Sequence, residues 1–110
     1  MVKQYKVLIS AQAQASLNRI VEFLTEEASA QVALNMERKL LEAIQSLKTF
    51  PNGYGQLPIK RKKSGNPYRF VPKEGYKIIF TVEEMPHAAV IVIELVHDSR
   101  SMKRVEQMLP

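Results

Sequence analysis

Two histidines and the absence of cysteine limit the reactive chemistry that this chain could carry. His97 ends a run of apolar residues, and its imidazole could act as a general base near neutral pH. More often, a histidine at a strand end anchors that end by hydrogen bonds. His87 follows Pro86 in a turn, where we expect it to be exposed. Because zinc sites need several close His, Cys or carboxylate ligands, two distant histidines predict neither a metal site nor a bound cofactor.

Basic residues gather in one part of the chain. Between Lys60 and Lys77 there are seven of them and a single acidic residue, so this segment carries more positive charge than the whole chain, whose net charge is +5. Such a region favours a polyanionic or acidic partner, although the run Lys60–Lys63 could also be a solvated loop. Arg100 and Arg104, four apart near the C-terminus, could extend the same patch or only aid solubility. The seven residues are Lys60, Arg61, Lys62, Lys63, Arg69, Lys73 and Lys77.

Length and composition predict one soluble domain over residues 1–110. Hydrophobic residues make up 45% and charged residues 25% of the chain, as in ordinary globular proteins. The N-terminus lacks the pattern of a secretory signal, and the longest apolar run, Ala88–Ile93, is far shorter than the roughly 18 residues that a membrane helix needs. The lack of cysteine agrees with a reducing compartment. We therefore expect a cytoplasmic protein without a membrane partner.

Hydrophobic periodicity predicts the elements that must position these groups. Residues Tyr5–Ile9 alternate as in a strand, and Ser10 could cap a helix whose apolar face includes Leu17 and Leu24. A break at Ser29 separates it from a second amphipathic helix, which Pro51 ends. Residues 51–66 should be irregular, strands should follow at 68–71, 76–82 and 88–96, and the tail should be helical. The order β-α-α-β-β-β-α predicts an α+β fold, with helices packed on one face of a small, mostly antiparallel sheet and 88–96 as a central strand.

The turn between the second and third strands makes a closer prediction possible. Lys73-Glu74-Gly75 fits a three-residue hairpin loop with glycine in the left-handed position. That register pairs Phe70 with Ile78, apolar with apolar. It also places Arg69 and Lys77 together on the other face of the sheet, where they could contact phosphates or an acidic partner, or form a solvated strand face.

Three segments resemble the RelE/ParE superfamily of bacterial toxins. Tyr5-Lys6-Val7-Leu8-Ile9-Ser10 is similar to the first strand of these toxins, and Ala15, Leu17 and Ile20 follow at the spacing of their first helix. Gly75-Tyr76-Lys77-Ile78-Ile79-Phe80 resembles the family's Gly-Tyr-Arg-apolar-apolar-Tyr strand. Val92–Arg100 resembles its last strand, which commonly closes with a His and then an Arg. The similarity covers nearly the whole chain in order.

The resemblance implies one of two activities and a protein partner. RelE-like members cleave mRNA in the ribosome, whereas ParE-like members poison DNA gyrase without acting as nucleases. Both belong to type II toxin–antitoxin modules, of the plasmid-stabilisation type, and are neutralised by an antitoxin. The implied partners are therefore the cognate antitoxin and either DNA gyrase or the ribosome with its mRNA. A homodimer or a toxin–antitoxin hetero-oligomer is compatible with this scheme.

The site residues favour the ParE branch. If the chain is a nuclease, Arg69, Lys77 and His97 are the candidate catalytic residues, but other basic or tyrosine positions of RelE fall on Val71, Asp98 and Arg104. The long helical hairpin and the ending His97-Asp98-Ser99-Arg100-Ser101-Met102 look ParE-like. We therefore expect a non-enzymatic gyrase toxin. A RelE-like endoribonuclease is the first alternative, and an inactive member or a small basic binding module is the second.

Overall fold

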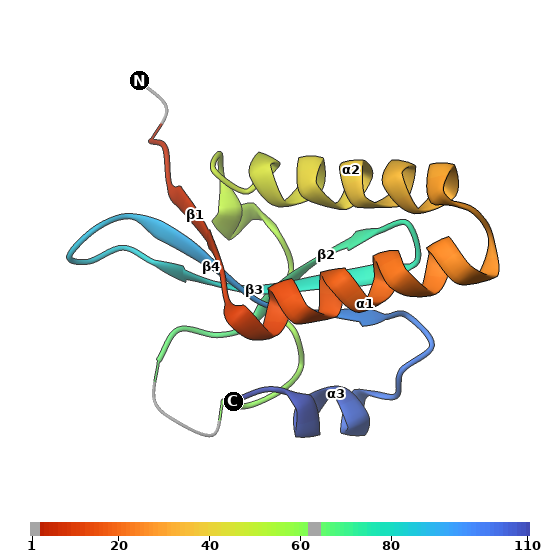
Figure 1. Ribbon diagram of the computed structural model, residues 1–110. Helices are drawn as coiled ribbons and strands as arrows, with labels where there is room; N and C mark the ends of the chain where they lie inside the picture. The colour runs from red at the N-terminus through yellow and green to blue at the C-terminus, as the bar shows by residue number, and fades with distance from the viewer. Residues whose placement is uncertain (1–2, 62–64) are drawn as a thin grey trace.

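Two antiparallel helices form a hairpin along one side of the molecule. The computed structural model describes residues 3–61 and 65–110. Helix α1 spans Ala11–Glu27 and α2 spans Ala30–Ser46, and the hydroxyls of Ser10 and Ser29 cap their first turns by accepting backbone N–H hydrogen bonds. The predicted break and the predicted cap at Ser10 are thereby confirmed, and Ser29 proves to be a cap as well. A short 3-10 turn, Pro51–Gly53, follows α2 and leads into an irregular segment (Figure 1).

The strands form one mixed sheet in the order β1-β4-β3-β2. Its members are β1 (Lys6–Ile9), β2 (Arg69–Lys73), β3 (Tyr76–Glu83) and β4 (Ala89–His97). β1 runs parallel to β4, and the other neighbours are antiparallel. The expected strand order along the chain, the mostly antiparallel sheet and the central position of β4 are confirmed. In the described part of the chain no helix is long and apolar enough to cross a membrane.

The helices do not all lie on one face of the sheet, and this part of the prediction is wrong. α1 and α2 cover the face that carries Ile78 and Phe80, whereas α3 (Met102–Met108) packs through Val105 against the opposite face, which carries Ile79 (Figure 1). The cause lies in β3, which is buried on both faces. An exposed apolar face costs about 25 cal/mol per Å², so the second face also needs a cover.

The β2–β3 register also differs from the expected one. A two-residue turn connects the strands, with Glu74 at φ 52° and Gly75 at φ 83°, and Phe70 pairs with Ile79 rather than Ile78. Because Ile78, Ile79 and Phe80 are all apolar and buried, the shifted Phe70 still pairs with an apolar residue, and the turn decides the register. Arg69 and Lys77 consequently lie on opposite faces of the sheet, not on the same face.

A β-bulge interrupts the pairing of β3 with β4. Phe80 pairs with Val92 and Ile79 pairs with Glu94, so Ile93 is the additional residue in β4. Val92 and Leu95 both pack in the core beneath α1 and α2, a spacing of three that regular alternation does not allow. The bulge therefore changes which side chains of β4 reach the helices at the C-terminal end of the strand.

Candidate functional site

A hollow of about 280 Å³ opens where β4 ends, between α1 and α3. α1 supplies one wall because its residues at three- and four-residue steps line the opening. The end of β4 and the segment after it supply the floor and the opposite wall, and α3 closes one side. The lining residues are Ser16, Arg19, Ile20, Phe23, Tyr76, Leu95, Val96, His97, Arg100 and Met108.

The hollow is electropositive and partly apolar. Arg19 and Arg100 are both exposed, and of the described residues that line the hollow none is acidic. Phe23 is 58% exposed and adds an aromatic surface to the opening. Ile20, Leu95 and Met108 add further apolar surface to the lining. The site can therefore hold a negatively charged group next to an apolar one.

His97 lies at the rim of this hollow and is held there by its neighbours. Its Nδ1 accepts the backbone N–H of Ser99 at 3.1 Å and also contacts the Ser99 hydroxyl at 2.7 Å. Its ring meets the ring of Tyr76 edge-on, with centroids 5.3 Å apart. Since a backbone N–H can only donate, the neutral imidazole carries its proton on Nε2. Nδ1 is thus occupied, and the geometry matches the anchoring role better than that of a general base. His87 is exposed, as expected.

A buried carboxylate behind the hollow was missed by sequence reasoning. Glu94 is 1% exposed and accepts hydrogen bonds from the Ser16 hydroxyl, from Gln12 Nε2 at 2.7 Å and from the Leu95 N–H at 2.9 Å. Arg19 Nη2 donates to the same Ser16 hydroxyl oxygen at 2.9 Å. The available signal was an acidic residue inside an otherwise apolar strand, because a buried carboxylate needs several partners.

Arg69 and Lys77 do not share a site with His97. Arg69 Nη1 donates to the Tyr54 carbonyl at 2.7 Å on the face covered by α1 and α2. Lys77 Nζ, on the other face, forms an ion pair with Asp98 at 3.0 Å. Neither residue lines the hollow. The three candidate catalytic residues are therefore separated, and each already has a partner within the protein.

The predicted basic patch is also divided among different surroundings. The Arg61 guanidinium lies over the Tyr68 ring, 5.0 Å from its centroid, and donates to the Asn66 carbonyl at 2.8 Å. Lys60 is exposed, and Arg104 is exposed on α3 away from the hollow. Lys62 and Lys63 lie outside the described residues. Of the patch residues in the described ranges, Arg100 is the one that lines the hollow.

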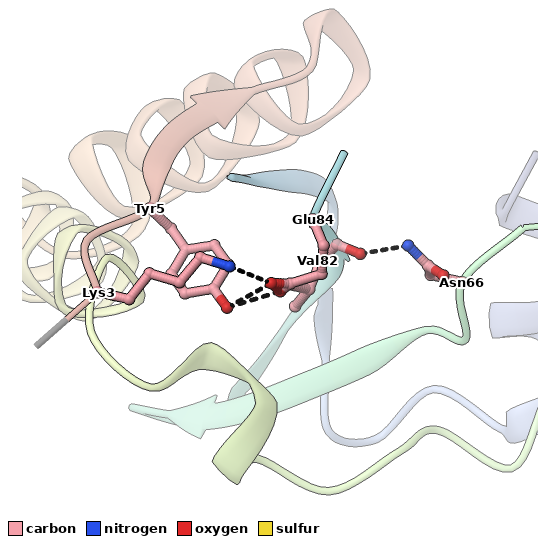
Figure 2. A network of polar contacts seen from close by, with 5 residues as sticks. All are labelled: Lys3, Tyr5, Asn66, Val82 and Glu84. Carbon is pink, nitrogen blue, oxygen red and sulfur yellow. Dashed lines mark hydrogen bonds and ion pairs between the residues drawn. The ribbon is translucent and has the colours of Figure 1, made fainter. Parts of the chain in front are cut away.

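A separate polar cluster joins the start of β1 to the end of β3 (Figure 2). Lys3 Nζ and the Tyr5 hydroxyl both donate to the Glu84 carboxylate, at 2.7 Å and 2.6 Å, and Asn66 donates to the Val82 carbonyl. The bonds from Lys3 and then Tyr5 lower the pKa of Glu84, and the same carboxylate raises the pKa of Lys3 and of Tyr5. Each of these side chains has a partner within the protein, so this cluster serves the fold.

Metal coordination has no support in the described ranges, 3–61 and 65–110. There, no three His, Cys, Asp or Glu side chains are grouped closely enough to hold an ion. Of the arrangements described above, the hollow with its cationic and apolar lining is the one that suits recognition of a partner.

Comparisons with known proteins give a consistent result. Residues 7–102 match the family model described as the ParE toxin of the type II toxin–antitoxin system, parDE. Among solved structures, the chromosomal ParDE toxin–antitoxin system from P. aeruginosa is similar, with a TM-score of 0.69. The alignment covers 86% of this chain and 97% of that chain at 15% sequence identity, a level at which the likeness concerns the fold. No curated protein matches the sequence. The expected RelE/ParE-like fold is confirmed.

Proposed function

This chain belongs to the ParE toxin family of type II toxin–antitoxin systems, and we propose that it arrests growth by poisoning DNA gyrase, without catalysing a reaction of its own. A toxin of such a system has an antitoxin as its partner. We further propose that residues 1–110 act as one toxin domain in the cytoplasm, where gyrase lies, and that the antitoxin holds the toxin in a hetero-oligomer.

The separation of Arg69, Lys77 and His97 is the observation that carries the proposal beyond family membership. Cleavage of RNA needs groups that activate a 2′-hydroxyl, stabilise the phosphate and protonate the leaving oxygen, all within reach of one phosphorus atom. Arg69 and Lys77 instead lie on opposite faces of the sheet, and His97 Nδ1 is occupied by Ser99. This supports the gyrase branch over the RelE-like nuclease.

A supercoiling assay with purified gyrase tests the proposal. We expect the toxin to inhibit supercoiling and to increase the fraction of DNA trapped in cleaved form. In cells, induction without antitoxin should stop thymidine incorporation before methionine incorporation. Rapid loss of methionine incorporation with continued DNA synthesis would instead establish the ribosome as the target. No growth effect would identify an inactive or purely binding member.

A further inference from the structure

We infer that the hollow between α1, the end of β4 and α3 binds a nucleoside monophosphate, with the phosphate held by Arg19 and Arg100 and the base stacked on Phe23. The same chemical unit occurs as a free mononucleotide and at the phosphorylated end of a nucleic acid strand, and binding measurements with each separate the two sources. The inference goes beyond the gyrase proposal because it concerns a ligand of the chain itself and needs no target protein.

Two guanidinium groups and an imidazole N–H make the hollow suitable for a phosphate. Arg19 and Arg100 are exposed, and neither forms an ion pair within the part of the chain that the structure describes. His97 carries its proton on Nε2, because its Nδ1 accepts the Ser99 N–H. A phosphate monoester has three terminal oxygens, so it offers an acceptor to each of these three side chains, whereas a carboxylate has only two oxygens.

The acidic residues around the hollow leave this positive charge available. Asp98 pairs with Lys77 at 3.0 Å, and Glu94 is buried behind the hollow, where its hydrogen-bond donors already occupy it. On α1, Glu22 follows Arg19 by three residues, but it neither lines the hollow nor pairs with Arg19. A bound anion therefore meets cations that no neighbouring carboxylate neutralises.

The apolar part of the hollow suits a planar base. Phe23 lines the opening with 58% of its surface exposed, and Ile20 and Met108 line the same hollow. Every base has a π-face, so bases of any identity stack on exposed aromatic side chains. A nucleotide joins such a base to a charged phosphate, and it therefore matches the apolar and the cationic parts of the lining at once.

The hollow has room and cations for one nucleotide unit. Its volume of about 280 Å³ lies just below the roughly 300–1,000 Å³ of small-molecule sites. A longer strand is bound by a row of cations that follows successive phosphates. Outside the hollow, Arg61 is committed to the Tyr68 ring and the Asn66 carbonyl, and Arg104 lies away from the opening. Neither side chain continues such a row, so a single phosphate is the better match.

Glu94 and Ser16 act as positioning residues for Arg19. The buried Glu94 carboxylate accepts the Ser16 hydroxyl hydrogen, which orients the Ser16 oxygen as an acceptor for Arg19 Nη2. The guanidinium is thus held before the ligand arrives, and less conformational entropy is lost on binding.

The test measures binding of adenosine monophosphate (AMP), adenosine and inorganic phosphate to the full chain by NMR titration, with neither gyrase nor antitoxin present. AMP should bind at least about tenfold more tightly than adenosine, because hydrogen bonds to a charged phosphate add to the stacking of the base. Inorganic phosphate should also bind more weakly than AMP, since it has no base. Bound AMP should raise the thermal unfolding midpoint, as any ligand of the folded state does.

Two kinds of variant separate the phosphate half of the hollow from the base half. Arg100→Gln should weaken AMP binding by about tenfold or more and leave adenosine binding unchanged. Phe23→Ala should weaken the binding of both ligands by about five- to a hundredfold, the range for loss of a base–aromatic stack. The matched controls, Arg104→Gln and Leu34→Ala, change exposed side chains outside the hollow, and each should change either affinity by less than about threefold.

The positioning role has its own readout. Arg19→Gln and Ser16→Ala should each weaken binding of AMP and not of adenosine, whereas a general structural defect would weaken both. The double variant should lose little more than either single variant, because both changes act on the same guanidinium. Arg19 is exposed, so Arg19→Gln retains the test even where Ser16→Ala is poorly folded. Additive losses would contradict the positioning role.

A short DNA strand with and without a 5′-phosphate distinguishes the two sources of the ligand. If the phosphorylated strand binds as tightly as AMP, the end of a strand is a ligand of the hollow. If AMP binds and the phosphorylated strand does not, the ligand is the free mononucleotide. Equal binding of both strands would contradict the assignment, because the strand without the terminal phosphate offers only internal phosphodiesters.

Three further results would overturn the inference. The first is the absence of saturable AMP binding to the folded chain. The second is binding of inorganic phosphate or benzoate as tight as that of AMP, which would make the hollow an anion site without preference for a nucleotide. The third is a loss of AMP affinity in Arg104→Gln and Leu34→Ala equal to that in Arg100→Gln and Phe23→Ala. Because gyrase is absent from these measurements, a failure of the gyrase proposal leaves the test intact.

Discussion

The Ser16 hydroxyl of α1 donates a hydrogen bond to the Glu94 carboxylate of β4, and both side chains are buried. This bond joins the helical hairpin to the middle of the sheet, 78 residues further along the chain. It also lies directly behind the hollow, since Ser16 lines it and contacts Arg19. One polar contact thus supports both the packing of α1 and the geometry of the hollow.

Loss of the Glu94 carboxylate should destabilise the protein. Glu94→Ala leaves Ser16, Gln12 and the Leu95 N–H without their acceptor, and we expect the free energy of unfolding to fall by about 1–3 kcal/mol. Glu94→Gln retains one acceptor oxygen and should lose less. Urea denaturation of the three proteins measures the differences. Equal stability of Glu94→Ala and the wild type would show that the network contributes nothing to the fold.

The cluster around Glu84 should make stability depend on pH at both ends of the scale. Because the folded-state pKa of Glu84 lies below its ordinary value of 4.5, its contribution is present above 4.5 and is lost as the pH falls through the lowered pKa. The pKa values of Tyr5 and Lys3 are raised above 10.0 and 10.5, so their contributions are lost as the pH rises through the raised values.

The variant Glu84→Gln isolates this effect. The difference in the free energy of unfolding between wild type and variant should be largest between pH 4.5 and pH 10.0. It should shrink in more acidic and in more basic solution. Unfolding midpoints measured across the pH scale for both proteins provide the comparison. A difference that stays constant from acid to base would contradict the assigned ionisation of the cluster.

The turn between β2 and β3 offers a stabilising substitution. Glu74 adopts φ 52°, a left-handed conformation that asparagine tolerates better than glutamate, and Gly75 follows at φ 83°. We expect Glu74→Asn to raise the free energy of unfolding by about 0.5–1 kcal/mol. The substitution also removes a weak, exposed ion pair between Lys39 and Glu74 at 3.6 Å. Lys39→Gln serves as the control for that loss, and thermal denaturation reports both effects.

Arg69 should matter for stability and not for catalysis. Arg69→Gln removes the hydrogen bond to the Tyr54 carbonyl, and we expect a loss of about 1.5–3 kcal/mol, as for hydrogen bonds to charged groups. Lys77→Gln breaks a partly exposed ion pair and should cost about 0–1 kcal/mol.

The functional counterpart compares variants at equal amounts of folded protein. Arg69→Gln, Lys77→Gln and His97→Gln should each keep the growth arrest and the gyrase inhibition, because none removes a reacting group under the gyrase proposal. If His97→Gln alone abolished toxicity while its unfolding midpoint stayed at the wild-type value, the result would favour the nuclease interpretation over the gyrase proposal.

Local patterns predicted most elements of the fold, while long-range geometry limited the rest. Ser10 was predicted as a helix cap and Ser29 as a break between helices. Both signals lie within a few residues of the helices that they precede, so the hairpin could be predicted from the sequence. The register of β2 against β3 did not, because Ile78, Ile79 and Phe80 are all buried and either face can be the core. A pattern that is apolar on both faces carries no information about a shift of one residue.

The candidate site was harder to predict because its two walls come from segments that are far apart in the sequence. His97 and Arg100 lie close together in the sequence and were identified, but the opposite wall comes from Arg19 and Phe23 on α1. On a helix these two look like ordinary exposed positions, and nothing local distinguishes them. Glu94 was the one residue whose setting, an acid within an apolar strand, could have directed attention to α1.

The parallel pairing of β1 with β4 has a consequence for how the protein is made. β1 emerges first from the ribosome, yet Lys6 pairs with Ala89 in the last strand. At synthesis rates of about 5–20 residues per second, β1 waits on the order of ten seconds for this neighbour. Until then neither the core under α1 nor the hollow exists, since both include β4. The nascent chain therefore completes its sheet, and with it the core and the hollow, only near the end of translation.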